Sequence, residues 1–219
     1  MARLVELRGM VALFADRTEA GEELAALLDA HDVVADLVLA VPRGGLPVGR
    51  VVADRLGVPL DVVVARKVGA PQNPELALGA VAADGSVWSN DDLVSSGGMS
   101  PEYLEDAIER EREAAQETVR RYRGTDSPPD LAGKRIVVVD DGVATGATAF
   151  ACLRQVRTAG AAHVTFAAPV GPPRTIERLR TEADAVVCVA TPPSFSAVSA
   201  FYDNFEQVPD ERAMASLEE

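Results

Sequence analysis

The sequence predicts an α/β fold: a doubly wound, mainly parallel five-stranded sheet with flanking helices. Two observations lead to this fold class. Strand and helix patterns alternate along most of the 219 residues, which is typical of a parallel sheet covered by helices. Five strand candidates take part in this alternation, and right-handed crossovers between them give an open sheet. A β-hairpin with a lid interrupts the pattern, and a small C-terminal hood follows it.

The first half of the sheet is predicted from local patterns. Asp16 begins a capping box ahead of an apolar face, which predicts a helix over 17–30. The apolar runs DLVLAV and LDVVVA indicate buried strands at 36–41 and 60–65. The segment between them, 45–56, is predicted as their crossover helix.

An insertion follows the second strand. Two runs at 76–83 and 86–89, joined by Asp-Gly, predict a β-hairpin with a two-residue turn. Ser100 as a cap, with proline in the first turn, predicts a long helix over 101–123. We expect the many charges of this helix to form a solvated face.

The second half of the sheet returns to strict alternation. Apolar runs predict buried strands at 136–139, 163–168 and 185–190. The connecting segments predict helices over 146–159 and 172–182, the latter begun by prolines. These elements complete the five-stranded sheet.

The composition favours a single globular domain outside the membrane. Apolar residues make up 47% of the chain, and a chain of this length can bury about 70% of its surface. No run of 18 apolar residues is present, so we expect no membrane-spanning helix. The N-terminus, with Glu6 and Asp16 around a short apolar stretch, does not resemble a signal peptide. Because Cys152 and Cys188 are too few for a disulfide framework, we expect a cytoplasmic protein.

The charge balance is strongly acidic. The formal net charge is −13, and such a surface repels phosphate backbones, so we expect no nucleic-acid partner. Only Lys67 and Lys134 are lysines. An acid-rich, lysine-poor chain is typical of a halophilic protein, because concentrated salt screens the repulsion between its charges. The alternative interpretation is a GC-rich genome, whose codons favour Arg and Ala.

The strongest chemical signal is the segment 136–148, IVVVDDGVATGAT. Its apolar strand ends in two acids, Asp140 and Asp141, and a small-residue loop then opens a helix. The loop consists of Gly142, Val143, Ala144, Thr145, Gly146, Ala147 and Thr148. Its N–H groups, its hydroxyls and the positive end of the helix suit a phosphate dianion. The two carboxylates suit vicinal hydroxyls and can help to hold Mg²⁺.

Together these features indicate a ribose 5-phosphate site. The segment is neither a Walker loop, which needs GK[ST], nor a GxGxxG dinucleotide loop. The alternative is a strand-to-turn junction with incidental acids, but two adjacent buried acids without partners are costly. A phosphohydrolase or receiver-like protein would use the acids but leave the TGAT sequence unexplained.

The segment IVVVDDGVATGAT resembles the binding motif for 5-phosphoribosyl 1-diphosphate (PRPP) of type I phosphoribosyltransferases. FADRTEAGEELA and VPRGGLPVG resemble a subgroup of that family whose acceptors are unassigned. The resemblance implies that Asp140 and Asp141 hold the ribose hydroxyls, and Mg²⁺ through those hydroxyls or water. It implies that the loop holds the 5-phosphate. It also implies one domain over 1–219, with its core at about 36–190.

Two further segments match the family in position. The segment of Pro42, Arg43, Gly44 and Gly45 matches the position of the family's diphosphate loop. Its glycines allow the backbone to approach a ligand closely, and its arginine offers two donors to a diphosphate. Its alternative is an ordinary strand-to-helix turn.

The segment 66–75 resembles the flexible catalytic lid. Arg66 and Lys67 would meet the leaving diphosphate, and Glu75 is a candidate general acid or base. An ordinary hairpin lead-in is the alternative. With the hairpin and the long helix, this lid makes up an insertion over about 66–123.

The acceptor side is predicted after the last strand, in a hood over about 192–205 together with the N-terminal segment. The candidate acceptor residues are Phe195, Phe201, Tyr202 and Asp203. Aromatic rings stack on planar bases, whereas a packed C-terminal flap is the alternative. Ala144 stands where the hypoxanthine-guanine branch carries an acid that contacts the purine, and the adenine branch tends to have alanine there.

The sequence therefore predicts a Mg²⁺-dependent phosphoribosyltransferase. It would move the 5-phosphoribosyl group of PRPP to a small nitrogenous base with release of diphosphate, as in nucleotide salvage. The alternative function is a PRPP- or nucleotide-sensing regulator without turnover. The oligomeric state is left open, and a homodimer is one of the states that the sequence allows.

Overall fold

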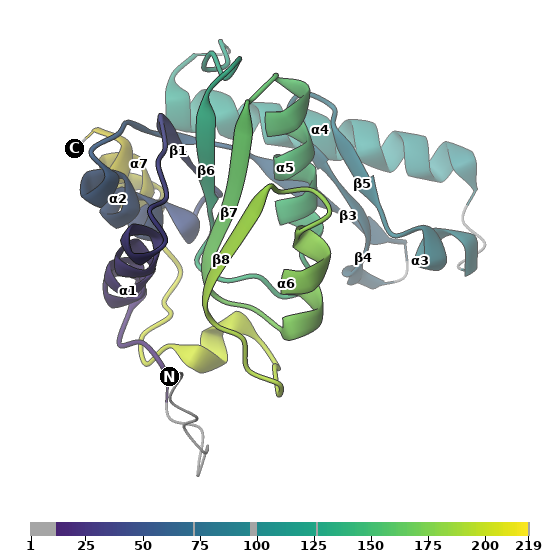
Figure 1. The fold of residues 1–219 in the computed structure, drawn as a ribbon. Helices are drawn as coiled ribbons and strands as arrows, with labels where there is room; N and C mark the ends of the chain where they lie inside the picture. The colour runs from purple at the N-terminus through teal and green to yellow at the C-terminus, as the bar shows by residue number, and fades with distance from the viewer. Residues whose placement is uncertain (1–11, 72, 97–99, 126, 219) are drawn as a thin grey trace.

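Five parallel strands form the central sheet of the protein, as predicted. The computed structural model describes residues 12–71, 73–96, 100–125 and 127–218. The strand order is β2-β1-β6-β7-β8 (Figure 1). The strands are β1 (Leu37–Ala40), β2 (Leu60–Val62), β6 (Arg135–Val139), β7 (His163–Val170) and β8 (Ala185–Ala190). Every neighbouring pair in this sheet is parallel.

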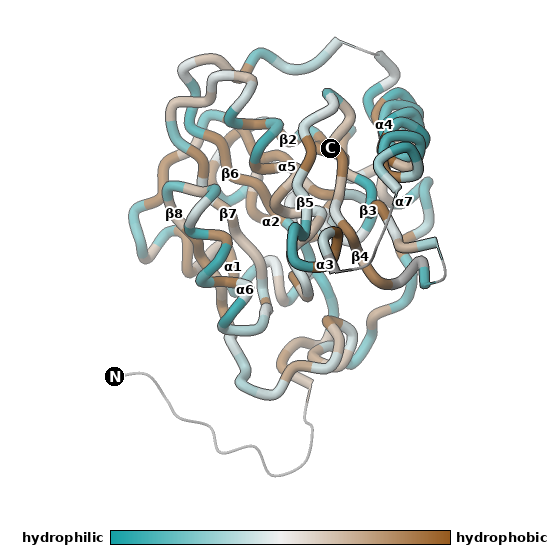
Figure 2. The backbone as a smooth tube through the Cα atoms, turned by 90° about the vertical axis from the view of Figure 1, so that its right-hand side faces the viewer, coloured by the Kyte–Doolittle hydropathy of each residue, from teal (hydrophilic) through white to brown (hydrophobic). Residues whose placement is uncertain are grey.

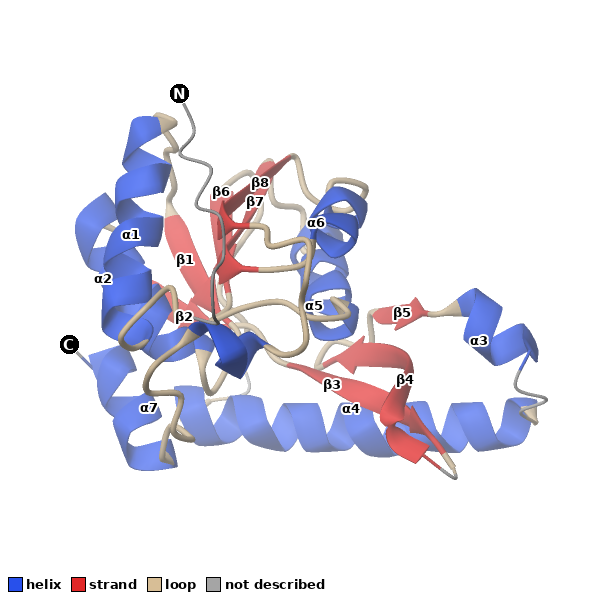
Figure 3. Ribbon diagram, turned by 90° about the horizontal axis from the view of Figure 1, so that it is seen from below, coloured by secondary structure: helices blue, strands red, loops and turns tan. Residues whose placement is uncertain are grey.

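Helices cover both faces of the sheet, which makes the fold doubly wound (Figure 3). The helices α1 (Arg17–Ala30) and α2 (Gly45–Leu56) cover one face. The helix α5 (Ala147–Thr158) packs on the other, with α6 (Pro173–Leu179) beside it. Alternate residues of β6 enter the two cores: Ile136 packs with α5 and Val137 with α1 and α2, as the pleat of a strand requires.

The local signals set most helix boundaries. The Asp16 carboxylate accepts hydrogen bonds from the amides of Thr18 and Glu19, and the hydroxyl of Ser100 accepts one from the amide of Tyr103. The predicted bounds of α1, α2 and β8 are confirmed. The predicted bounds of α5 and α6 are one to a few residues too wide, since the terminal turns are not helical.

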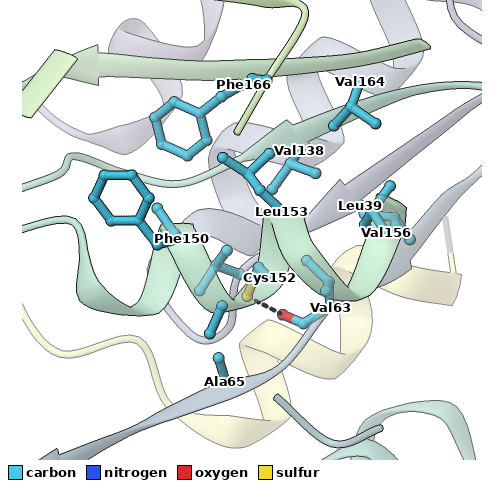
Figure 4. Packing of buried hydrophobic residues seen from close by; sticks show 14 of the residues in the cluster. Leu39, Val63, Ala65, Val138, Phe150, Cys152, Leu153, Val156, Val164 and Phe166 are labelled. Atoms are coloured by element: carbon cyan, nitrogen blue, oxygen red, sulfur yellow. Dashed lines mark hydrogen bonds between the residues drawn. The ribbon is translucent and has the colours of Figure 1, made fainter. Parts of the chain in front are cut away.

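The core over α5 is closely packed (Figure 4). Phe150 and Leu153 of α5 lie against Phe166 of β7 in a cluster with almost no solvent access. Cys152 is fully buried in the same cluster, where its thiol donates to the carbonyl of Val63 at 3.9 Å. Burial raises the pKa of this thiol well above its usual range. Cys152 therefore acts as a small apolar side chain of this core.

The insertion forms a second, antiparallel sheet carried by a long helix (Figure 3). Its strands are β3 (Ala65–Ala70), β4 (Asn73–Ala82) and β5 (Val87–Ser89), and α4 (Pro101–Arg123) packs along β3 and β4. The hairpin predicted at 76–89 is confirmed by pairing of Val81 with Val87. The short helix α3 (Asp91–Ser96) follows it.

Two predictions about this region are wrong. The strand predicted at 60–65 ends at Val62, and Ala65 begins the second sheet. The segment 66–75, predicted as a flexible loop, consists mostly of β3 and β4, which pair with each other through Lys67 and Ala80. A β-hairpin satisfies the backbone groups that a loop would leave to water.

The C-terminal region lies against the N-terminal one. The 3₁₀ helix η1 (Val198–Phe201) and the helix α7 (Asp210–Glu218) follow β8, and α7 was not predicted. Phe14 pairs with Tyr202 in an isolated parallel bridge. Figure 2 shows hydrophilic residues over most of α4 and hydrophobic residues in the strands of the central sheet. Over the described ranges, no helix is long and apolar enough to cross a membrane.

Candidate functional site

The candidate site lies where the chain changes direction in the sheet. From β1 the chain continues outward to β2, whereas from β6 it continues the other way, to β7 and β8. The strands β1 and β6 are direct neighbours, with Ala40 beside Val139. The segments that follow them therefore meet at the carboxyl edge. Ligands of open α/β sheets bind at such a switch point.

The backbones of the segments that follow β1 and β6 lie very close to each other. A Cβ atom on Gly44 would overlap the Asp141 carboxylate, and one on Gly45 would lie 2.9 Å from the carbonyl of Val139. Glycine at both positions is therefore a steric requirement. The peptide bond between Pro42 and Arg43 is cis.

The loop after β6 presents a row of free amides. Among the described residues, the N–H groups from Ala144 to Ala149 have no acceptor. The last three belong to the first turn of α5, where helical amides have no partner within the helix. Gly146 precedes the helix in a left-handed conformation, with φ +84°. Such a row of amides at a helix N-terminus favours a bound anion.

Contacts from neighbouring elements fix this loop. The amide of Val143 donates to the carbonyl of Val170 at 2.9 Å. The hydroxyl of Thr175 donates to the carbonyl of Ala144 at 2.7 Å. Because both contacts leave the free amides untouched, the loop is ordered before an anion arrives. Ordering entropy then opposes binding only weakly.

The two acids lie beside this loop. The amide of Asp141 donates to Oδ1 of Asp140 at 2.9 Å. Burial, and after it the charge of Asp141, raises the pKa of Asp140 well above its usual range. Burial also raises the pKa of Asp141, although Arg17 acts in the opposite direction. Two buried carboxylates with raised pKa values destabilise the fold when they are ionised, and such pairs are typical of a functional site.

Sequence reasoning missed the partner of the acid pair. Arg17, the first residue of α1, donates through Nε to Oδ2 of Asp141 at 2.7 Å. The Arg17 and Asp141 side chains are only 12% and 13% exposed. The two residues are 124 positions apart in the chain, so no local pattern links them. The one available signal was that Arg17 belongs to the FADRTEAGEELA segment.

The Arg43 side chain contacts α7 through Asp210. Its Nη1 lies 3.4 Å from Oδ1 of Asp210, which also accepts a hydrogen bond from the hydroxyl of Tyr122 at 2.9 Å. Burial, and then Asp210, raises the pKa of Tyr122 to about 12. Arg43 is 37% exposed, so its guanidinium is reachable from solvent.

The predicted lid cations lie on β3. Arg66 forms an ion pair with Glu111 of α4 at 3.4 Å, and Lys67 is exposed. No hydrogen bond or ion pair within the described ranges joins either cation to the acid pair. The backbone of Glu75 lies in β4, and its side chain is outside the described part.

The aromatic residues of the predicted hood pack largely on one another. The ring of Tyr202 lies 5.3 Å from that of Phe14 and 4.9 Å from that of Phe205, and its side chain is buried. Its hydroxyl donates to the carbonyl of Asp141 at 2.5 Å. These contacts leave Tyr202 little free surface for stacking on a base.

The remaining acceptor candidates are more exposed to solvent than Tyr202. Phe195 and Phe201 face each other at 5.2 Å and stay half-buried, while Asp203 is exposed. The hood is therefore a packed aromatic cluster, and Tyr202 within it contacts the backbone of Asp141.

The chain as a whole is similar to known proteins in sequence and in fold. The family model described as "Phosphoribosyl transferase domain" matches residues 16–206. A Mycobacterium tuberculosis protein named "putative phosphoribosyl transferase" is 45% identical over 208 residues, covering 94% of this chain and 46% of its own length. The chain thus spans about half the length of the curated relatives it matches. The crystal structure of TT1426 from Thermus thermophilus is 42% identical, with a TM-score of 0.78, and the match covers 93% of this chain and 97% of that one.

Proposed function

The chain belongs to the phosphoribosyl transferase domain family, and on that premise we propose that it moves the 5-phosphoribosyl group of PRPP to a small nitrogenous base. The acceptor nitrogen displaces diphosphate from C1 of the ribose. The C1–O bond to diphosphate breaks as the C1–N bond forms, and the transition state carries positive charge at C1. The acceptor and a role in nucleotide salvage are part of the proposal.

The observation that carries this proposal is the free amide row beside the acid pair. The amides from Ala144 to Ala149 suit the 5-phosphate. Asp140 and Asp141 suit the ribose hydroxyls, which would donate to their free carboxylate oxygens. A ribose 5-phosphate presents both a phosphate for such a row of amides and vicinal hydroxyls for the two carboxylates.

The chain's cations act on the leaving diphosphate. Arg43, with Pro42, Gly44 and Gly45, follows β1 at the same sheet edge, and its guanidinium is partly exposed. It would donate two hydrogen bonds to diphosphate oxygens in place of the long contact with Asp210. Stabilising the charge that develops on the leaving group lowers the barrier directly.

The acid pair also fits Mg²⁺ bound through substrate oxygens. Within the described ranges, no group of three or more His, Cys, Asp and Glu side chains could hold a metal ion. Mg²⁺ is usually held by one or two carboxylates together with substrate phosphates and water. Asp140 and Asp141 would supply these carboxylates, directly or through ribose hydroxyls and water. The ion would neutralise charge on the diphosphate.

One observation favours a second candidate, a PRPP- or nucleotide-sensing regulator without turnover. Arg66 is paired with Glu111, and Arg66 and Lys67 belong to a regular β-strand. A catalytic role would require this hairpin to move toward the diphosphate. A sensor would keep the ribose-phosphate site and leave the hairpin where it is.

A screen of acceptors distinguishes the two functions. Purines, pyrimidines and small amines are incubated with PRPP and Mg²⁺, and diphosphate release is measured. We expect base-dependent release from the wild-type chain and much slower release from Asp140→Asn at PRPP concentrations that do not saturate the variant. If PRPP binds in calorimetry but no acceptor gives release, the sensor is the correct function.

A further inference from the structure

Arg17 connects the acid pair to the C-terminal part of the chain. Its Nε donates to Asp141, and its Nη1 donates to the carbonyl of Glu206 at 2.8 Å. The guanidinium carbon lies 3.9 Å from the centre of the Phe205 ring, within the range of a cation–π contact. One mostly buried side chain thus contacts Asp141 and two adjacent residues of the C-terminal region, Phe205 and Glu206.

Residues 198–206, here called the tail segment, touch the acid pair by other routes as well. The hydroxyl of Tyr202 donates to the carbonyl of Asp141. Val198 fills the space that a Cβ on Gly142 would need. The carboxylate, the carbonyl and the next residue after Asp141 are therefore each in contact with Arg17 or with the tail segment.

The tail segment is also held by the chain just before α1. The amides of Asp203 and Asn204 donate to the carbonyls of Phe14 and Ala15 at 2.9 and 2.8 Å. These two amides report on whether the tail segment is docked, because a docked amide exchanges its hydrogen slowly.

These contacts restrict the Asp141 carboxylate. Arg17 engages Oδ2, while the backbone of Gly44 lies against the same carboxylate. The group is therefore held in one orientation before any sugar binds. A ribose hydroxyl that donates to Asp141 meets an acceptor already connected to the tail segment.

We infer that Arg17 is a positioning residue that couples binding of the ribose hydroxyls at Asp141 to docking of the tail segment. This inference rests on the proposed function, in which Asp141 accepts a hydrogen bond from PRPP. Binding of PRPP fixes Asp141, Arg17 transmits that restraint to Phe205 and Glu206, and the tail segment opens less often. The acceptor side of the site is then most ordered when PRPP is in place.

The test uses variants with one matched control. Arg17→Met keeps an unbranched side chain about as long as the aliphatic part of arginine but removes both donors and the charge, and Arg17→Lys restores the charge. Arg55→Met is the control, because Arg55 forms an exposed ion pair with Asp29 at the opposite end of α1. PRPP affinity is measured by calorimetry, and hydrogen exchange is followed in peptides that contain Asp203 and Asn204, with and without PRPP.

We expect PRPP to slow exchange at these amides in the wild-type chain and in Arg55→Met. In Arg17→Met, PRPP affinity falls about 10-fold or more, since a buried carboxylate loses its charged donor. Saturating PRPP then no longer slows the tail amides. Arg17→Lys recovers part of both effects, which a purely structural role in the fold would not produce.

Two outcomes overturn the inference at different levels. If the wild-type chain does not bind PRPP, the proposed function fails and the coupling with it. If it binds PRPP and Arg17→Met shows the same affinity and the same slowing, only the coupling fails. Should Arg17→Met not fold, Phe205→Leu is the second test, because it leaves Arg17 and Asp141 in place and removes the ring on which the guanidinium lies. Slowing of the tail amides as strong in Phe205→Leu as in the wild-type chain contradicts the coupling.

Discussion

The backbone of Gly44 lies against the carboxylate of Asp141, so closely that a Cβ at position 44 would overlap Oδ2. The two residues follow neighbouring parallel strands, which bring them to one sheet edge. Arg17 donates a hydrogen bond to the same oxygen. The site therefore depends on a contact that only glycine permits.

Gly44→Ala tests this contact. The new methyl group must push the Asp141 carboxylate away, so we expect PRPP affinity to fall about 10-fold or more. Calorimetric titration with PRPP measures the loss. Gly133→Ala is the control: Gly133 has φ +71° and faces open space, so its alanine costs about 1–2 kcal/mol of folding stability. Loss of binding in the control, or normal binding in Gly44→Ala, would contradict this role of Gly44.

Asp140→Asn and Asp141→Asn should each weaken PRPP binding about 10- to 150-fold, because each removes a charge-assisted hydrogen bond to the ribose. Their effects on stability should differ in size. Asp140 is ionised at a cost, so its asparagine variant should melt at a higher temperature than the wild type. Burial raises the pKa of Asp141 as well, but Asp141→Asn also leaves the Arg17 guanidinium without its carboxylate, so it should melt at a lower temperature than Asp140→Asn.

The pH dependence of the Asp140→Asn effect follows from the direction of the pKa shift. The folded pKa of Asp140 lies above the unfolded value of about 4. The penalty is therefore absent below that value and grows as the pH rises through the folded pKa. Thermal melts should show a larger gain for Asp140→Asn at pH 7 than at pH 4.

PRPP affinity equal to that of the wild-type chain in both Asp140→Asn and Asp141→Asn would show that the acid pair does not bind the ribose.

Local signals and distant contacts differ in how far the sequence predicts them. The caps Asp16 and Ser100 and the apolar runs of the five strands are short-range features, and the structure confirms the elements they predict. The helix α7 escaped prediction because it carries one buried residue, Ala213, and no capping signal was recognised. The hairpin of β3 and β4 escaped because glycine and proline at 69–74 masked its pairing.

The same distinction holds for the candidate site. The acids and the loop after β6 could be predicted because they are contiguous in sequence. Arg17 could not, since its contact with Asp141 depends on how α1 docks on the sheet. The contact between Arg43 and Asp210 depends likewise on where α7 lies.

Stability should rise with ionic strength. The chain carries a net charge of −13, and salt shortens the range of charge repulsion from about 10 Å at 0.1 M to about 3 Å at 1 M. We expect the melting temperature to increase as KCl is raised over this range. A melting temperature that stays constant or falls would contradict the halophilic interpretation and favour codon usage as the origin of the acidic composition.

Hypoxanthine and guanine should be poor acceptors. Ala144 is exposed at the loop and carries only a methyl group, which accepts neither a proton nor a hydrogen bond from a purine ring. Adenine or a non-purine acceptor should therefore give faster diphosphate release. Ala144→Asp places an acid at this position and should increase release with hypoxanthine relative to adenine. Efficient release with guanine in the wild-type chain would mean that another residue supplies the contact.

The loop after β6 should bind an oxyanion in the absence of PRPP. Its amides from Ala144 to Ala149 lack acceptors among the described residues, and Val143 and the carbonyl of Ala144 are already held by neighbouring elements. The N-terminus of α5 favours a negative charge by about 0.3–2 kcal/mol. Net acidity opposes binding at long range, but salt screens that effect more than contacts within the loop.

A crystal grown with sulfate or phosphate provides the measurement. We expect one anion in contact with the backbone amides between Ala144 and Thr148, and Asp140 and Asp141 on the side where the ribose would lie. Thr145→Pro supplies the control in solution, because proline removes one of the amides and should reduce the rise in melting temperature that phosphate causes in the wild-type chain. An ordered loop that holds only water in saturating sulfate would contradict the ribose-phosphate site, because nothing in the loop would then need to rearrange for an anion to bind.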